Sequence, residues 1–104
     1  IPTPSLNRIA AGGTVFPQAY VAHPNSSANR AGLLTGRYPQ RFGYERAIAW
    51  RPQDPSVGLP AAEKTLAEAL RPLGYKSGLV GKWHLGAHDD FHPNNRGFDE
   101  FYGY

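Results

Sequence analysis

One short segment, residues 26–36, places the strongest constraint on how this chain can fold. It reads Ser-Ser-Ala-Asn-Arg-Ala-Gly-Leu-Leu-Thr-Gly, an apolar helical stretch that stops at a glycine. Ser26 and Arg30 are four positions apart, so on a helix they share one face near its amino end. Free N–H groups and the helix dipole attract anions at that end. A hydroxyl, a guanidinium and a helix terminus together predict a site for a tetrahedral oxyanion such as sulfate or phosphate.

The first part of the chain predicts a helix and a strand before this site. A Thr-Pro pair at residues 3–4 is suited to begin a helix, which the glycine pair at 12–13 ends. Residues 14–16, Thr-Val-Phe, are a short strand candidate. The helix of the anion site is expected to begin near residue 27 or 28.

The second half of the chain predicts a loop, a helix and a strand. Residues 38–60 carry four prolines and are expected to form a long surface loop, a kind of segment that is often functional. A capping box at residues 65–68 begins a helix that Pro72 distorts. The expected apolar stripe of this helix consists of Leu66, Ala69, Leu70 and Leu73. Residues 75–83 are the best strand candidate. Helices that alternate with strands favour an α/β fold with a parallel sheet.

Lys82 and His84 are candidates for the second half of the anion site. They flank Trp83 at the end of the predicted strand, and alternate residues of a strand point to the same face. Ligand sites of open α/β sheets lie at the carboxyl ends of the strands. We therefore expect Lys82 and His84 to point together into a site, with Trp83 on the opposite face.

Each candidate also has an ordinary structural interpretation. Ser26 could be the cap of its helix, Arg30 a solvated surface residue, and His84 a polar residue at a strand edge. Packing in the core is favoured over sugar contacts for the aromatic residues Trp83, Phe98, Phe101, Tyr102 and Tyr104. A solvated loop is favoured over a metal site for His88, Asp89, Asp90 and His92.

The composition excludes several classes of function. With 104 residues the chain is about one small domain, and with no cysteine it has no disulfides and no thiolate metal sites. The net charge is +3, but no run of five basic residues is present, so nucleic acid is not an expected partner. No apolar run is long enough for a membrane span, and no signal peptide is visible. A mild excess of positive charge suits a cleft for anionic esters.

The segment that begins at Ser26 resembles the signature of the type I sulfatases. In that family a Cys or Ser opens the motif, an Arg follows four places later, and Thr-Gly closes the helix. The resemblance continues in the family's order through nearly the whole chain, over residues 3–10, 36–39, 66–70, 74–78, 81–86 and 96–104. Several collinear motifs are far more specific than one short motif. The resemblance implies an alkaline-phosphatase-like α/β fold, a parallel sheet with flanking helices. Residues 1–104 would be an amino-proximal part of its catalytic domain.

The resemblance also implies a mechanism and a set of partners. Ser26 would be oxidised to formylglycine by a maturase, and would be the only ligand within this chain for a calcium ion. Arg30 would hold the hydrated formylglycine, Lys82 would bridge it to the sulfate, and His84 would take a proton from it. The substrate would be a sulfated carbohydrate or an aryl sulfate, and the parent would be a periplasmic or secreted bacterial enzyme. Residues 1–104 alone are expected to be inactive.

Two positions depart from the commonest form of the motif. Ser26 stands where most members have Cys, and Asn29 stands where they have Ser. Ser in the first place occurs in members that depend on a radical-type maturase, although an engineered Cys-to-Ser change would look the same. Two alternative functions also stay open: a phosphonate monoester or phosphodiester hydrolase of the same superfamily, and a non-catalytic remnant that binds sulfated glycans. The sequence does not identify the sugar or the position of its sulfate.

Overall fold

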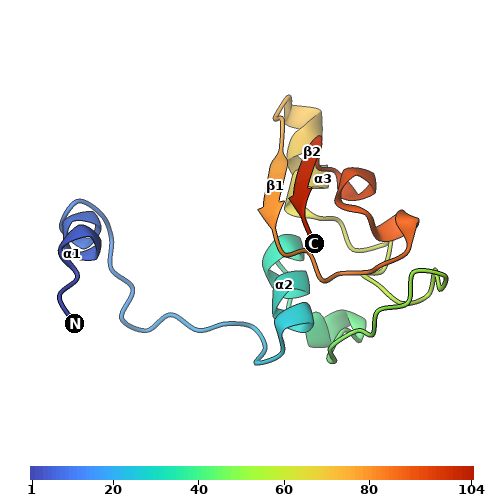
Figure 1. Ribbon diagram of the computed structural model, residues 1–104, viewed down its shortest axis with the longest axis horizontal. Helices are drawn as coiled ribbons and strands as arrows, with labels where there is room; N and C mark the ends of the chain where they lie inside the picture. Colours follow the sequence, from blue (N-terminus) through green and yellow to red (C-terminus); the bar gives the residue numbers. More distant parts are fainter.

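The computed structural model describes residues 1–104 and contains a small parallel sheet with helices packed beside it (Figure 1). Strands β1 (Gly78–Gly81) and β2 (Glu100–Gly103) pair in parallel, with Gly78 opposite Glu100. The α-helices are α1 (Pro4–Ala11), α2 (Ser26–Thr35) and α3 (Leu66–Leu70). Short 3-10 helices lie at η1 (Pro39–Phe42), η2 (Arg71–Leu73), η3 (Asp89–Phe91) and η4 (Pro93–Arg96). None of the α-helices has the length and apolar character that a membrane crossing requires.

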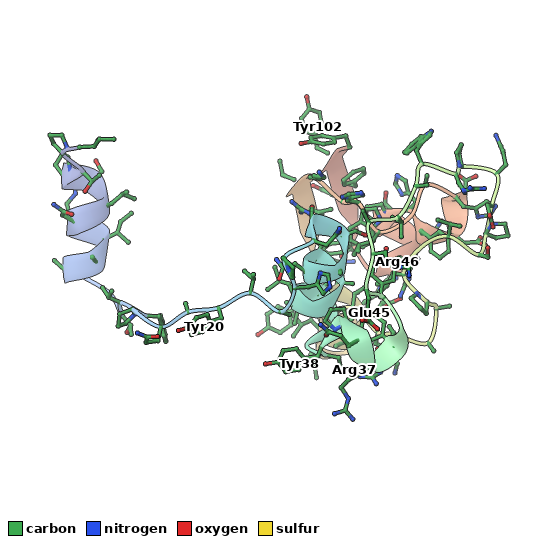
Figure 2. The ribbon with its side chains drawn as sticks, turned by 90° about the horizontal axis from the view of Figure 1, so that it is seen from below. Tyr20, Arg37, Tyr38, Glu45, Arg46 and Tyr102 are labelled. Carbon is green, nitrogen blue, oxygen red and sulfur yellow. The ribbon has the colours of Figure 1, made fainter.

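Helix α1 lies apart from the rest of the molecule. Figures 1 and 2 show it at the end of an extended segment, on which Tyr20 is labelled. No residue of α1 is buried. The predicted strand at residues 14–16 is wrong: this segment is irregular and exposed, because no neighbouring strand lies beside it to form a ladder of hydrogen bonds.

Helix α2 begins one residue earlier than expected. Asn25 is its N-cap, and the Asn25 side chain accepts a hydrogen bond of 3.3 Å from the Ser27 backbone N–H. Gly36 ends the helix in the left-handed conformation, at φ 66°. Because Asn25 caps the helix, the Ser26 side chain is available for other contacts. The interpretation of Ser26 as the cap is therefore wrong.

The capping box of α3 is confirmed, but the predicted apolar stripe is wrong. The Thr65 hydroxyl accepts from the Glu68 backbone N–H at 3.1 Å, and the Glu68 carboxylate accepts from the Thr65 N–H at 2.6 Å. Leu66 and Leu73 are exposed, whereas Ala67 is buried. Ala67 belongs to the core cluster, and Gly97 packs on this part of the helix so closely that a Cβ there would lie 2.9 Å from the Ala67 carbonyl carbon.

The core lies between α2, α3 and the segment after β1. Leu59 and Leu85 are fully buried at its centre. Trp83 and Phe98 are buried and meet edge to face, with ring centroids 6.0 Å apart, as expected for packing residues. Tyr102 and Tyr104 are exposed, so the expectation that they pack in the core is wrong, and Figure 2 shows Tyr102 projecting from the end of β2.

The buried side chain of Arg96, at the end of η4, bonds to α3 and to the segment before α3. The Arg96 guanidinium donates to the backbone carbonyls of Leu59 at 2.8 Å and Glu63 at 2.7 Å, and to the Glu68 carboxylate at 3.3 Å. In return the Thr65 hydroxyl donates to the Arg96 carbonyl at 2.8 Å. One side chain therefore satisfies acceptors on two segments, using the planar fork of donors that lysine lacks.

Replacing Arg96 with Lys should lower the free energy of unfolding by about 2–4 kcal/mol, because buried carbonyls lose their donors. The exposed Arg51, changed to Lys, is the matched control and should leave stability unchanged. Chemical denaturation measures both. Equal stabilities of the two variants would contradict this role of Arg96.

Candidate active site

The amino end of α2 meets the segment that follows β1. The Ser26 Oγ lies 3.4 Å from the His84 Nδ1, and the Arg30 Nε donates to the same Ser26 oxygen at 3.2 Å. The Arg30 Nη1 also donates to the Lys82 backbone carbonyl at 2.7 Å. The structure thus places Ser26 and Arg30 on one helix face, as their spacing predicts, and brings His84 to them from 58 residues away.

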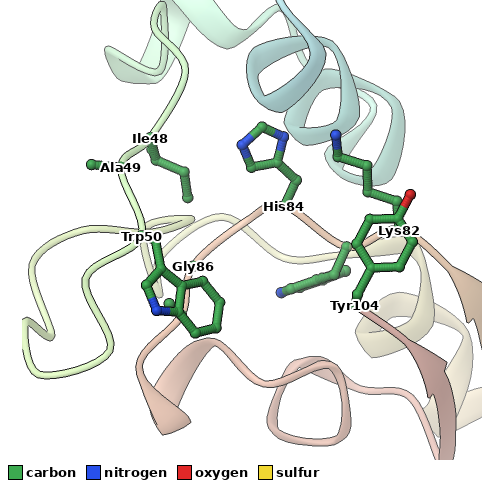
Figure 3. Close-up of a pocket in the computed structure, with 9 residues that line it drawn as sticks. Ile48, Ala49, Trp50, Lys82, His84, Gly86 and Tyr104 are labelled. Atoms are coloured by element: carbon green, nitrogen blue, oxygen red, sulfur yellow. The ribbon is translucent and has the colours of Figure 1, made fainter.

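Lys82 and His84 point to the same side, as the sequence predicts. Strand β1 ends at Gly81, but the Trp83 N–H still donates to the Tyr104 carbonyl at 2.7 Å, so the parallel pairing continues past the strand. Figure 3 shows Lys82 and His84 extending in a similar direction, and both line one pocket. The buried Trp83, expected on the opposite face, lines this pocket too. All four candidate residues of the sequence therefore lie in one region.

His84 has an unusual backbone that brings its side chain to Ser26. Its φ is 61°, the only left-handed value at a residue other than glycine in this chain. Such a conformation costs about 1–3 kcal/mol and persists only where the surroundings hold it. The hydroxyl of Ser27, a fully buried residue, lies 2.8 Å from the His84 carbonyl oxygen and donates to it. The first turn of α2 thereby holds His84 in place.

Tyr44 completes this contact. Its hydroxyl lies 3.0 Å from the Ser27 Oγ. Because the Ser27 proton goes to the His84 carbonyl, which can only accept, the Tyr44 hydroxyl is the donor between the two side chains. Burial raises the pKa of the Tyr44 phenol, so it stays protonated and keeps this donor. Sequence reasoning missed Ser27 and Tyr44, since nothing in their local pattern indicates a partner at His84.

The surroundings keep His84 neutral. Burial lowers the pKa of the imidazole, and the positive charges of Lys82 and Arg30 lower it further, although a hydrogen bond to the Ile48 backbone opposes the shift. Nδ1 faces Ser26, so the bond to Ile48 falls to the other ring nitrogen. A proton on that nitrogen leaves Nδ1 free to accept one from Ser26.

The other three histidines of the chain each accept a hydrogen bond from a backbone N–H two residues further on. The Nδ1 atoms of His88 and His92 accept backbone N–H groups at the starts of η3 and η4, each at 3.3 Å. His23 does the same for the Asn25 N–H at 3.0 Å, just before α2. These contacts favour the interpretation of the loop residues as structural.

Comparison with known proteins identifies the chain's relatives. The sulfatase family profile matches residues 1–104. N-acetylgalactosamine-6-sulfatase of Homo sapiens is 47% identical over 106 residues, which cover 97% of this chain and 20% of that protein. Arylsulfatase G of Homo sapiens is 46% identical over 102 residues, which cover 97% and 19%. The chain therefore spans about a fifth of the length of these relatives.

A solved structure shares the fold. The crystal structure of Ps i-CgsB superposes with a TM-score of 0.88 at 43% identity, over 98% of this chain and 22% of that one. The same protein in complex with k-i-k-neocarrahexaose superposes with a TM-score of 0.84. The observed parallel strands and helices are thus part of the α/β sulfatase domain that the sequence predicts.

Changing Ser27 to Ala should lower the free energy of unfolding by about 1–2 kcal/mol, because the partly buried His84 carbonyl loses its donor. Tyr44→Phe is the matched control: it removes the partner of Ser27 but keeps the bond to His84, so its cost should be smaller. Denaturant unfolding measures both. A Ser27→Ala variant as stable as the parent would show that this bond does not hold His84.

Proposed function

The chain belongs to the sulfatase family. We propose that it is part of an enzyme that hydrolyses sulfate esters of carbohydrates, and that it carries the nucleophile at Ser26 and three further catalytic groups. The observation that supports this most strongly is the convergence of Arg30 and His84 on the Ser26 oxygen. The names of two relatives point to sulfated sugars: one is an N-acetylgalactosamine-6-sulfatase, and Ps i-CgsB was crystallised with a neocarrahexaose.

Ser26 must be modified to complete this reaction. An unmodified serine could attack the sulfur atom of an ester and expel the alcohol, but it would then carry a stable sulfate ester. Formylglycine made from Ser26 by a maturase supplies a hydrated aldehyde, in which one hydroxyl attacks sulfur and the other expels sulfate as the aldehyde forms again. The contacts of Ser26 fit such a group, because a hydrogen-bond donor and a proton acceptor already meet at its oxygen.

The neighbouring residues have distinct roles. Arg30 donates to the Ser26 oxygen and holds it in position while its positive charge favours an anionic substrate. Lys82, which lines the pocket beside His84, supplies a second positive charge for the sulfate oxygens. His84 takes the proton from the hydroxyl at Ser26, because its Nδ1 faces that oxygen and its low pKa keeps it neutral.

Calcium does not fit the residues of this chain alone. This ion takes 6–8 oxygen ligands, mostly carboxylates and carbonyls. The side chains grouped with Ser26 are Arg30, Lys82 and His84, which are basic. No three residues among His, Cys, Asp and Glu come together as a metal site in the structure. A calcium ion at Ser26 would therefore need carboxylate ligands that residues 1–104 do not place there.

Ser26→Ala in the full-length enzyme should abolish turnover of sulfate esters, since no hydroxyl remains to be oxidised. Ser26→Cys should retain activity when the host supplies a maturase that recognises Cys. An assay with an aryl sulfate and a sulfated monosaccharide measures both variants. Normal turnover by the Ala variant would contradict the nucleophile and the mechanism together.

As the pH falls, kcat/KM should begin to decrease only below pH 6.5, because 6.5 is the ordinary pKa of histidine and the pKa of His84 is lowered. Burial and the nearby charges disfavour protonation of His84, so the neutral base persists to lower pH than a free imidazole would. His84→Gln should lower the rate and remove this decrease. A decrease that begins at or above pH 6.5 in the unchanged enzyme would contradict the assignment of His84 as the base.

A further inference from the structure

A pocket of about 300 Å³ opens beside His84 and Lys82 (Figure 3). Its other walls are mostly apolar and come from three places: the loop at residues 48–50, the neighbours of His84 (Trp83, Gly86 and Ala87), and Tyr104. Figure 3 shows Trp50 and Tyr104 on opposite sides of the pocket, with His84 and Lys82 on a third side. The pocket therefore has one basic side, and three aromatic side chains line the rest of it: Trp50, Trp83 and Tyr104.

Trp50 lines this pocket with most of its side chain exposed. It is one of two tryptophans in the chain, and it is 81% exposed whereas Trp83 is buried. Because the Trp50 indole lines the pocket, it offers a large flat apolar surface to a bound ring.

The loop that carries Trp50 is anchored to the site. The Leu59 N–H donates to the Leu85 carbonyl at 2.8 Å, and Gly58 and Gly86 form an antiparallel bridge. Within the loop, the Asp54 carboxylate accepts from both the backbone N–H and the hydroxyl of Ser56, which closes a tight turn. The same hydrogen bonds lower the pKa of Asp54. The contacts of Gly58 and Leu59 fix the far end of the loop to the two residues directly after His84.

The polarity of the pocket matches that of a sulfate monoester whose alcohol is a ring, such as a sugar or a phenol. Such a molecule has an anionic sulfate at one end and a ring with an apolar face at the other. Given the proposed function, we propose that the ring bearing the sulfate lies between Trp50 and Tyr104, with its flat face against the Trp50 indole. The sulfate then points to Lys82, His84 and Ser26. At about 300 Å³ the pocket is at the small end of ligand sites, which suits one ring.

Trp50 is therefore a residue that sets specificity for ring substrates, and its variants test this in the full-length enzyme. Trp50→Ala should lower kcat/KM by about tenfold for a pyranose sulfate, an aryl sulfate or both, because the stacking surface is lost. A short alkyl sulfate has no ring and should lose little. Trp50→Phe should retain most of the activity on rings. The exposed Gln53, changed to Ala in the same loop but outside the pocket, is the matched control.

The outcomes distinguish a failure of the role of Trp50 from a failure of the proposed sulfatase function. A loss confined to the pyranose sulfate identifies a sugar ring as the ligand, and a loss confined to the aryl sulfate identifies an aromatic ring. Equal losses on the alkyl and ring sulfates, or no loss on either, would overturn the role of Trp50 while leaving the proposed function intact. An unchanged enzyme that hydrolyses no sulfate ester would contradict the proposed function itself, and this inference with it.

Discussion

The left-handed backbone of His84 is the conformation on which the geometry of this site depends. With φ at 61°, the chain turns as it leaves β1 and brings the imidazole Nδ1 within 3.4 Å of Ser26. The Ser27 hydroxyl supplies part of the energy that holds this turn, by donating to the His84 carbonyl. Consecutive residues of α2 therefore have complementary roles: Ser26 presents its oxygen to the site, and Ser27 positions the residue that faces that oxygen.

A second set of contacts holds the loop that carries Trp50 against the segment after β1. Arg96 fixes the carbonyls of residues 59 and 63, and the Leu59 N–H pairs with the Leu85 carbonyl, one residue after His84. The long loop at residues 38–60 is thus attached to the core at its end rather than free. This attachment explains how a segment rich in proline can hold Trp50 next to Lys82 and His84.

The sequence predicted the features that local patterns control. The four-residue spacing of Ser26 and Arg30, the glycine that ends α2 and the capping box of α3 are all present. The errors arose where contacts between distant segments determine the secondary structure or the buried face of a helix. The segment at residues 14–16 had strand character but has no partner strand, and the side of α3 that carries Ala67, rather than the apolar stripe, faces the core. Ser27 and Tyr44 were missed because the hydrogen bonds that they make depend on residues far away in the sequence.

The central claim, that the Ser26 side chain becomes the aldehyde nucleophile, can be tested by the mass of one peptide. Trypsin should release residues 9–30, which contain Ser26 and end at Arg30. In an active full-length enzyme we expect this peptide to be lighter by two hydrogen atoms, to react with an aldehyde reagent, and to carry the change at Ser26 on fragmentation. An active enzyme whose Ser26 is entirely unmodified would contradict the account.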